Sequence, residues 1–389
     1  MAKTTKKTTK ANAAKKAVKA AKKKHSLAFC VIVLIILLLG SGIGYLYGKG
    51  YLPIGGETES QSESLRPSVI SDGELQIHFL ELGNYYTGDC TYIKAGDVDI
   101  LIDAGSRTSS IPTISSYLDQ YVTDGKLEYV IVTHAHQDHY AGFATNEKTD
   151  SLFDLYECET IVDFALTNQK ASGAMYGNYL RELADEVAAG ATHLTAAECI
   201  EQGKNVFDLG DGMTLEILDS YFYYNKSSTE NNYSVCVLLT QGDRNYLFTG
   251  DLEEDGEEKL VEMNDLPKVE VFKAGHHGSK TSSTEPLLAV IRPEIVCICT
   301  CCGSPEYTTN KDNQFPTQAF CDRVAPYTDR VYATSLYDET AAGKYVSMNG
   351  NIVVTSTPAG ITVECSSSDL VLKDTAWFKA NRTCPAAWK

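Results

Sequence analysis

The chain has 389 residues and a formal net charge of -17 at pH 7. The first 25 residues contain ten lysines and no acidic residue, so the remainder of the chain carries a net charge of about -27. A body this acidic argues against a surface built to hold nucleic acid, because phosphate contacts dominate that kind of binding. The basic tail, in contrast, is typical of a segment that meets acidic partners.

An uncharged apolar segment follows the lysine tail. Residues 27–47 contain no charged side chain and include VIVLIILLLG, which is about the length that spans a bilayer. A cleaved signal peptide is the alternative, but its basic region is normally short and no A-x-A site follows here. We therefore predict a cytoplasmic tail over residues 1–25 and a transmembrane signal anchor over 26–48. The Gly-, Ser- and Glu-rich residues 49–73 are predicted to be a flexible linker to an extracytoplasmic body.

The body begins with a β-rich stretch. Apolar residues alternate in LQIHFLELG, CTYIKAG and VDILIDAG, which predicts three strands between residues 75 and 103, the last ending in Asp103. Residues 107–121 have helical spacing of Ile111, Ile114 and Leu118. Strand and helix signals then alternate, with a second helix expected from about residue 176 to 189.

The next strand ends in an unusual cluster of polar residues. The β-branched run at residues 129–132 is followed by His134, His136, Asp138 and His139, so three of the eight histidines fall within six residues. Imidazole and carboxylate groups are the ligands that suit zinc, iron or manganese. Chance is a poor explanation, because imidazoles massed at a buried strand end need a metal or other partners.

The second half of the body repeats the strand-then-helix pattern and also places polar residues at strand ends. One strand ends in Asp251 and the next ends in His276 and His277, which glycines flank. The repeated pattern predicts two β-sheets packed face to face with helices outside. Asp251 could instead cap the helix that follows it.

The cysteines do not form a familiar metal motif. Cys297, Cys299, Cys301 and Cys302 lie in a strand-like run, and alternation along a strand favours core packing for them. Eleven cysteines lie beyond the apolar segment, so they cannot all pair within one chain. Cys365 and Cys384 could form a disulfide in an extracytoplasmic setting.

These motifs resemble those of the metallo-β-lactamase superfamily. Residues 134–139 match its HxHxDH motif, and the strand end at Asp251 resembles its later acidic motif. The strings KAGHHGSKTSS and NNYS resemble the branch that contains ComEC-type DNA-uptake hydrolase domains and bacterial surface phosphorylcholine esterases. The resemblance implies an α/β fold, a four-layer αββα metallo-β-lactamase sandwich over residues 74–355, with a C-terminal extension over 356–389.

The resemblance also implies a site. Two divalent ions, zinc or alternatively manganese or iron, would be held by six ligands, with Asp251 bridging: His134, His136, Asp138, His139, Asp251 and His277. Asp138 and His276 would be catalytic, although spacing alone allows His276 and His277 to exchange roles. Asp103, Asn232 and Ser279 would be supporting residues. One histidine ligand of the superfamily is missing, because His193 has a different context; Asp219 is the nearest positional substitute.

We therefore expect a membrane-anchored, extracytoplasmic, metal-dependent hydrolase, and most specifically a phosphodiesterase that uses a hydroxide activated by two metals. Its partners would be the cytoplasmic membrane, through the N-terminal helix, and an ester or phosphodiester of the cell surface. A ComEC-like DNA nuclease is the first alternative, although the acidic body disfavours DNA. A non-enzymatic surface protein that keeps the metal-binding fold is the second.

Overall fold

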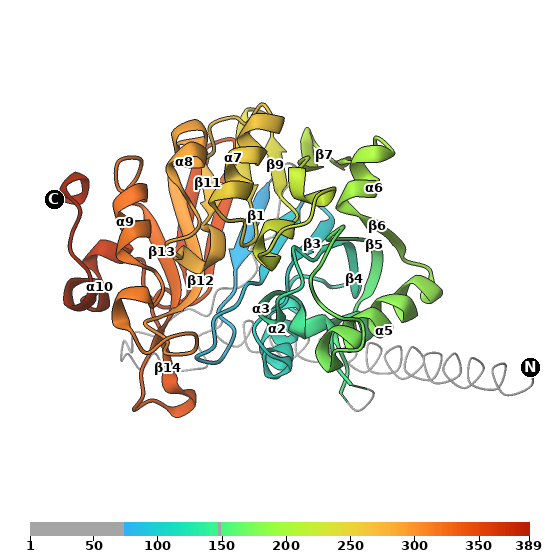
Figure 1. Ribbon diagram of the computed structural model, residues 1–389, viewed down its shortest axis with the longest axis horizontal. Helices are drawn as coiled ribbons and strands as arrows, with labels where there is room; N and C mark the ends of the chain where they lie inside the picture. Colours follow the sequence, from blue (N-terminus) through green and yellow to red (C-terminus); the bar gives the residue numbers. More distant parts are fainter. Residues whose placement is uncertain (1–73, 147–148) are drawn as a thin grey trace, which may run out of the picture. The chain divides into compact units, whose positions relative to one another are not determined.

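Two eight-stranded β-sheets form the centre of the computed structural model, which describes residues 74–146 and 149–389 (Figure 1). The first sheet has the edge-to-edge order β16 (Gly360–Cys365), β15 (Ile352–Thr357), β1 (Leu75–Phe79), β2 (Thr91–Ala95), β3 (Val98–Ile102), β4 (Lys126–Ile131), β5 (Glu157–Asp163) and β6 (Thr192–Thr195). The second has the order β14 (Tyr345–Ser347), β13 (Val331–Tyr337), β12 (Ile295–Cys302), β11 (Val271–Lys273), β10 (Arg244–Phe248), β9 (Val237–Gln241), β8 (Met213–Ile217) and β7 (Val206–Gly210).

Helices lie outside both sheets, which confirms the predicted α/β fold with two sheets. Those beside the first sheet are α2 (Ile111–Leu118), α4 (Leu152–Leu155), α5 (Ala174–Ala189) and α6 (Ala196–Glu201). Those covering the outer face of the second are α7 (Glu254–Met263), α8 (Glu285–Ile291), α9 (Gln318–Val324) and α10 (Ala376–Asn381). The helix predicted over residues 107–121 is shorter than expected, because a 3-10 turn at Thr108–Ser110 precedes α2.

Strand β12 shows how the core forms. All eight of its residues are buried, and its side chains alternate between the two apolar layers. Cys297 and Cys299 join the core between the sheets, whereas Val296 and Ile298 pack under the outer helices. The cysteines of this strand are therefore core residues, as the alternation predicted. Cys365 and Cys384 are both free, so the suggested disulfide is not formed.

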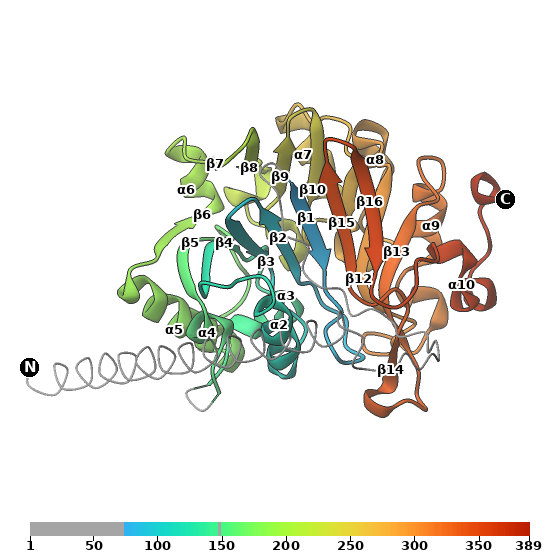
Figure 2. The same cartoon turned by 180° about the vertical axis from the view of Figure 1, so that it is seen from behind.

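The predicted domain ends at residue 355, but the first sheet continues beyond it. Strand β16 pairs antiparallel with β15 along its whole length, and Figure 2 shows β15 between β16 and β1. Phe378 and Trp388 of the expected extension are buried in the apolar layer between the second sheet and its outer helices. Residues 356–389 thus contribute an edge strand and a helix to the fold, because their apolar side chains have a surface to pack on.

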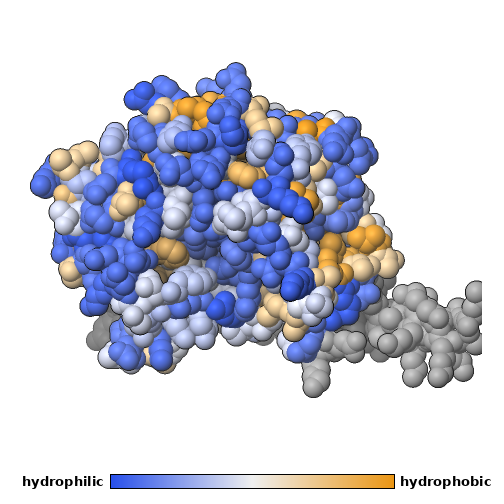
Figure 3. Space-filling view, viewed as in Figure 1, coloured by the Kyte–Doolittle hydropathy of each residue, from blue (hydrophilic) through white to orange (hydrophobic). Residues whose placement is uncertain are grey.

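No helix within residues 74–146 and 149–389 has both the length and the apolar character needed to cross a membrane. The predicted tail at 1–25, signal anchor at 26–48 and linker at 49–73 lie outside the described residues. The face of the body drawn in Figure 3 is mostly hydrophilic, with small hydrophobic groups scattered over it.

Candidate metal centre

The predicted site residues follow four strand ends that lie close together. Strands β3 and β4 are parallel in the first sheet, and β10 and β11 are parallel in the second. The carboxyl ends of parallel strands meet at one edge of a sheet, where ligands commonly bind. Asp103 follows β3, the HxHxDH residues follow β4, Asp251 follows β10 and the histidine pair follows β11.

Asp251 lies between the two histidines that converge on it from different sheets. Its Oδ2 is 3.2 Å from His139 Nε2 and 3.3 Å from His277 Nε2, and the backbone N–H of Asp251 donates to Ser234 Oγ at 3.0 Å. Asp138 Oδ2 is 3.4 Å from the same His277 nitrogen. The Asp251 carboxylate therefore lies close to candidate ligands from both sheets.

Two overlapping groups of residues could each hold a cation. His134, His139 and Asp251 form one, and Asp138, His139 and His277 form another, with the ligand atoms of each group within 4.8 Å of one another. All five residues are buried, yet Asp251 Oδ1, His139 Nε2 and His277 Nε2 have no hydrogen-bond partner among the described residues. Buried polar atoms without partners call for an ion or a similar ligand. The residues thus fit divalent cations of the kind that bind nitrogen and oxygen.

His136 lies at the edge of this cluster. Its Nδ1 is 3.0 Å from His134 Nε2, and the side chain is partly exposed. Burial lowers the pKa of His134 well below its ordinary value, which favours the neutral ring that can offer a lone pair. Although burial alone raises the pKa of Asp251, the imidazoles of His139 and His277 hold it well below its usual range.

The two adjacent histidines at the end of β11 face different surroundings. His277 is fully buried, whereas 20% of the His276 side chain is exposed. His276 Nδ1 lies 3.1 Å from Thr281 Oγ1 and 3.5 Å from Glu253 Oε1, which leaves Nε2 3.9 Å from Asp251 Oδ2. Burial lowers the pKa of His276, with Asp251 and Glu253 opposing that effect. His277 belongs to the groups of candidate ligands, and His276 stands beside them at the open side.

A loop below the cluster holds the HxHxDH turn in place. Asp103 accepts hydrogen bonds from the Thr133 backbone N–H and hydroxyl, both at 2.8 Å, and from His139 Nδ1 at 2.7 Å. Nε2 of His139 is thereby directed toward Asp251. A Cβ on Gly105 would lie 1.5 Å from the Asp138 carbonyl oxygen, so only glycine permits this close approach.

The other predicted supporting residues act through the neighbouring loops. Asn232 is buried, and its Oδ1 accepts a hydrogen bond from the Glu253 backbone N–H at 3.2 Å. The Ser279 backbone N–H donates to the His276 carbonyl at 2.8 Å, which closes the turn that carries the histidine pair. Asp251 does not cap α7, because the residue at that position is Glu253.

The profile of the metallo-beta-lactamase superfamily matches residues 84–149 and 169–301, a little over half of the chain. The chain belongs to the metallo-β-lactamase superfamily. Within the superfamily it is similar to ComE operon protein 3 of Bacillus subtilis strain 168, at 26% identity over 44% of this chain and 20% of that protein. It is also similar to competence protein ComA of Neisseria gonorrhoeae, at 24% identity over 80% of this chain and 37% of that protein.

Recombination protein 2 of Haemophilus influenzae is a third relative, at 30% identity over 32% of this chain and 14% of that protein. The chain thus spans well under half the length of each of these relatives, and together they support the ComEC-type branch of the superfamily. Among solved structures, the chain is similar to the metallo-β-lactamase fold protein YhfI of Bacillus subtilis, with a TM-score of 0.39 and 12% identity over 73% of this chain and all of that one.

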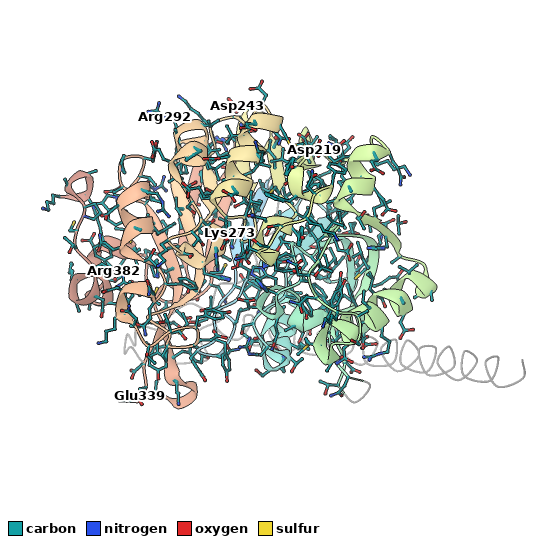
Figure 4. The ribbon with its side chains drawn as sticks, in the orientation of Figure 1. Asp219, Asp243, Lys273, Arg292, Glu339 and Arg382 are labelled. Atoms are coloured by element: carbon teal, nitrogen blue, oxygen red, sulfur yellow. The ribbon has the colours of Figure 1, made fainter. Side chains whose placement is uncertain are left out.

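Three residues at the candidate metal centre were not predicted from the sequence: Asp89, Lys273 and Tyr307. Asp89 and Lys273 form a buried ion pair, and Asp89 Oδ1 also lies 3.1 Å from His277 Nδ1. Figure 4 shows Lys273 in the middle of the molecule. The hydroxyl of Tyr307 donates to Asp138 Oδ2, although 55% of this tyrosine is exposed. A lysine inside the apolar strand VEVFKA was a usable signal, since lysine is rarely buried without a partner.

Neither candidate for the missing histidine ligand joins the centre. His193 Nε2 is paired with Asp163 Oδ1 at 2.8 Å, on β6 and β5. Asp219, away from Lys273 in Figure 4, is in none of the candidate ligand groups found in the described part of the chain. Its backbone N–H donates to Asn264 Oδ1 at 3.2 Å. The expectation that Asp219 substitutes for the histidine is therefore wrong: β8, which precedes it, does not end beside β10 and β11.

Proposed function

We propose that this domain is a metal-dependent phosphodiesterase. The observation that carries the proposal is the position of Asp251. Its carboxylate lies against His139 from the first sheet and His277 from the second, and the more exposed His276 lies beside them. Two divalent cations bound there would lower the pKa of a water molecule and neutralise charge on a phosphoryl group. Zinc is the expected metal, with manganese and iron as alternatives.

The side chains of the site have distinct roles in this proposal. His134, His139 and Asp251 would hold one cation, with His136 beside them. Asp138 and His277 would hold the other, together with the shared ligands His139 and Asp251. Asp138 would also orient the attacking water, and the Tyr307 hydroxyl, which donates to its Oδ2, would hold this carboxylate in place. His276 Nε2 would donate a proton to the leaving oxygen. Its Nδ1 is held by Thr281 and Glu253, which fixes the direction of the ring.

DNA is the second candidate substrate, and the competence-protein relatives favour it. The charge of the chain opposes it, because about -27 remains after the lysine tail and a nuclease needs positive groups along its groove. Arg107, which follows Gly105 and Ser106, is paired with Glu306. A small cell-surface phosphodiester, such as a phosphocholine ester, tolerates an acidic enzyme better.

The test is a comparison of substrates on the purified full-length protein with zinc or manganese added. We expect chelator-sensitive hydrolysis of bis-p-nitrophenyl phosphate and of phosphocholine esters. Cleavage of single-stranded DNA at a comparable kcat/KM would favour the nuclease instead. Bound metal without hydrolysis of any of these substrates would contradict both and favour a non-enzymatic role.

We also propose that the domain is anchored in the cell membrane by residues 26–48, with its site outside the cytoplasm. The uncharged segment and the ten lysines before it support this orientation. Protease added to intact cells should remove the body after residue 49. A body that stays intact while surface controls are digested would contradict the orientation.

A further inference from the structure

A buried ion pair joins the two sheets directly beneath the candidate metal centre. Asp89 precedes β2 of the first sheet, and Lys273 is the last residue of β11 in the second. Each is 3% exposed or less, and the ammonium group contacts Asp89 Oδ2. A cavity of about 10 Å³, lined by both residues, lies beside the pair and has room for about one water molecule. Burying two charges costs desolvation free energy, which suggests that this ion pair has a role beyond stability.

Asp89 is positioned to orient His277. Nδ1 of His277 lies 3.1 Å from Asp89 Oδ1 and 3.0 Å from the Cys299 carbonyl oxygen. Two acceptors around one nitrogen place the hydrogen on Nδ1, so Nε2 keeps the lone pair that a metal needs. The arrangement repeats that of His139, whose Nδ1 faces Asp103 at 2.7 Å. Each of the two central histidines therefore has a carboxylate within hydrogen-bond distance behind it, whereas Asp89 Oδ2 lies farther from His139 Nδ1, at 3.8 Å.

Asp89 is also close enough to become a ligand itself. Its carboxylate, Asp251 and His277 form a group whose ligand atoms lie within 4.8 Å of one another. Asp89 differs from the other carboxylates of the centre because it is paired with the ammonium group of Lys273. A paired carboxylate is less available to a cation, because the lysine already satisfies its charge.

We propose that Asp89 and Lys273 form a positioning pair for His277: Asp89 fixes the ring for metal binding, and Lys273 keeps Asp89 from entering the coordination shell. This inference rests on the proposed metal centre. It makes the two charges unequal in their effect on metal binding. Loss of the carboxylate frees the ring and leaves a positive charge near the cation, whereas loss of the ammonium group frees a carboxylate that can bind the cation.

The test is titration of the full-length protein with Co²⁺, whose visible absorption reports the number and kind of its ligands. Asp89→Asn should weaken the binding of one ion by about 10- to 100-fold. Lys273→Met should not weaken binding, and it should change the Co²⁺ absorption spectrum because Asp89 joins the ligands. The control is Lys94→Met with Asp99→Asn, which removes a largely buried pair in the first sheet whose charged atoms are 2.9 Å apart; it should bind Co²⁺ as the wild type does.

The double variant Asp89→Asn with Lys273→Met separates orientation from charge. It leaves the net charge of the pair at zero, so weaker binding of one ion reports the lost orientation of His277, and it avoids an unpaired buried charge if a single variant fails to fold. We expect at least severalfold weaker binding. Wild-type affinity in the double variant, or equal weakening by the two single changes, would overturn the inference. A wild-type protein that binds no Co²⁺ would instead overturn the metal centre itself.

Discussion

Replacing His276 tests whether the exposed member of the histidine pair is a proton donor and not a metal ligand. His276 has φ 46° and ψ 47°, in the left-handed region that most residues avoid. Alanine, like histidine, bears a backbone cost of about 1–2 kcal/mol in this region, whereas asparagine adopts this conformation more readily. His276→Asn is therefore the variant of choice, and His277→Asn is its matched comparison, since φ is 55° there.

The size of the effect follows from the geometry. His276 Nε2 is 3.9 Å from Asp251 Oδ2, so the ring borders the centre without belonging to the candidate ligand groups. His276→Asn should keep its metal and lose about 10²- to 10⁴-fold in kcat, as expected for a lost general acid. That corresponds to about 3–5 kcal/mol in the barrier. His277→Asn should lose metal as well as activity, because this ring is fully buried against two carboxylates.

The assay compares phosphodiesters with poor and good leaving groups. A p-nitrophenol group leaves without a proton, so the loss in His276→Asn should shrink for p-nitrophenyl substrates. Because burial lowers the pKa of His276, a lower pH increases the fraction of protonated ring, and the gap between wild type and variant should widen as the pH falls. An equal loss on both kinds of substrate would refute proton donation. Metal loss in His276→Asn with full occupancy in His277→Asn would reverse the assignment.

Three further changes test other parts of the structure. Tyr307→Phe removes the hydroxyl that contacts Asp138 and should lower kcat/KM by about 10- to 100-fold with no change in metal content, measured by kinetics and elemental analysis. Gly105→Ala should weaken metal binding in chelator competition, because the new methyl group would collide with the Asp138 carbonyl. His193→Gln should destabilise the protein most below pH 6.5, measured by urea unfolding from pH 5.5 to 8.5. Burial lowers the pKa of His193 but Asp163 raises it above 6.5, so the pair contributes about 1 kcal/mol or less at low pH and loses this as the pH rises through the folded pKa.

Much of the fold was predictable because its signals are local. The alternation in strands such as β12 and the helical spacing in α2 and α5 report burial that neighbouring residues share. The candidate ligands at the ends of β4 and β11 could be proposed for the same reason, since each motif lies within one short segment. The helix length was missed where a 3-10 turn interrupts the pattern, and the C-terminal strand was missed because the resemblance stopped before it.

The remaining site residues depend on contacts between distant segments. Asp89 is 188 residues from His277, and its role arises only when the two sheets pack together. Tyr307 meets Asp138 across 169 residues, and nothing in its own neighbourhood marks it. Asp219 was suggested by position along the chain, which says nothing about the place of β8 near the far edge of its sheet. Residues whose partners are local can be predicted from one sequence, whereas residues whose partners come from another sheet need the fold.

We propose that Asp251 is shared by two metal ions, and the metal content of the protein tests this most directly. Elemental analysis of the purified full-length protein should find two ions per chain in the wild type. Asp251→Ala should lose both, because Asp251 Oδ2 lies within 3.3 Å of the ligand nitrogens of His139 and His277 and is proposed to serve both ions. Asp219→Ala is the matched control and should keep both ions, since this aspartate also follows a strand of the second sheet but belongs to neither site. Two ions retained in Asp251→Ala would contradict the account.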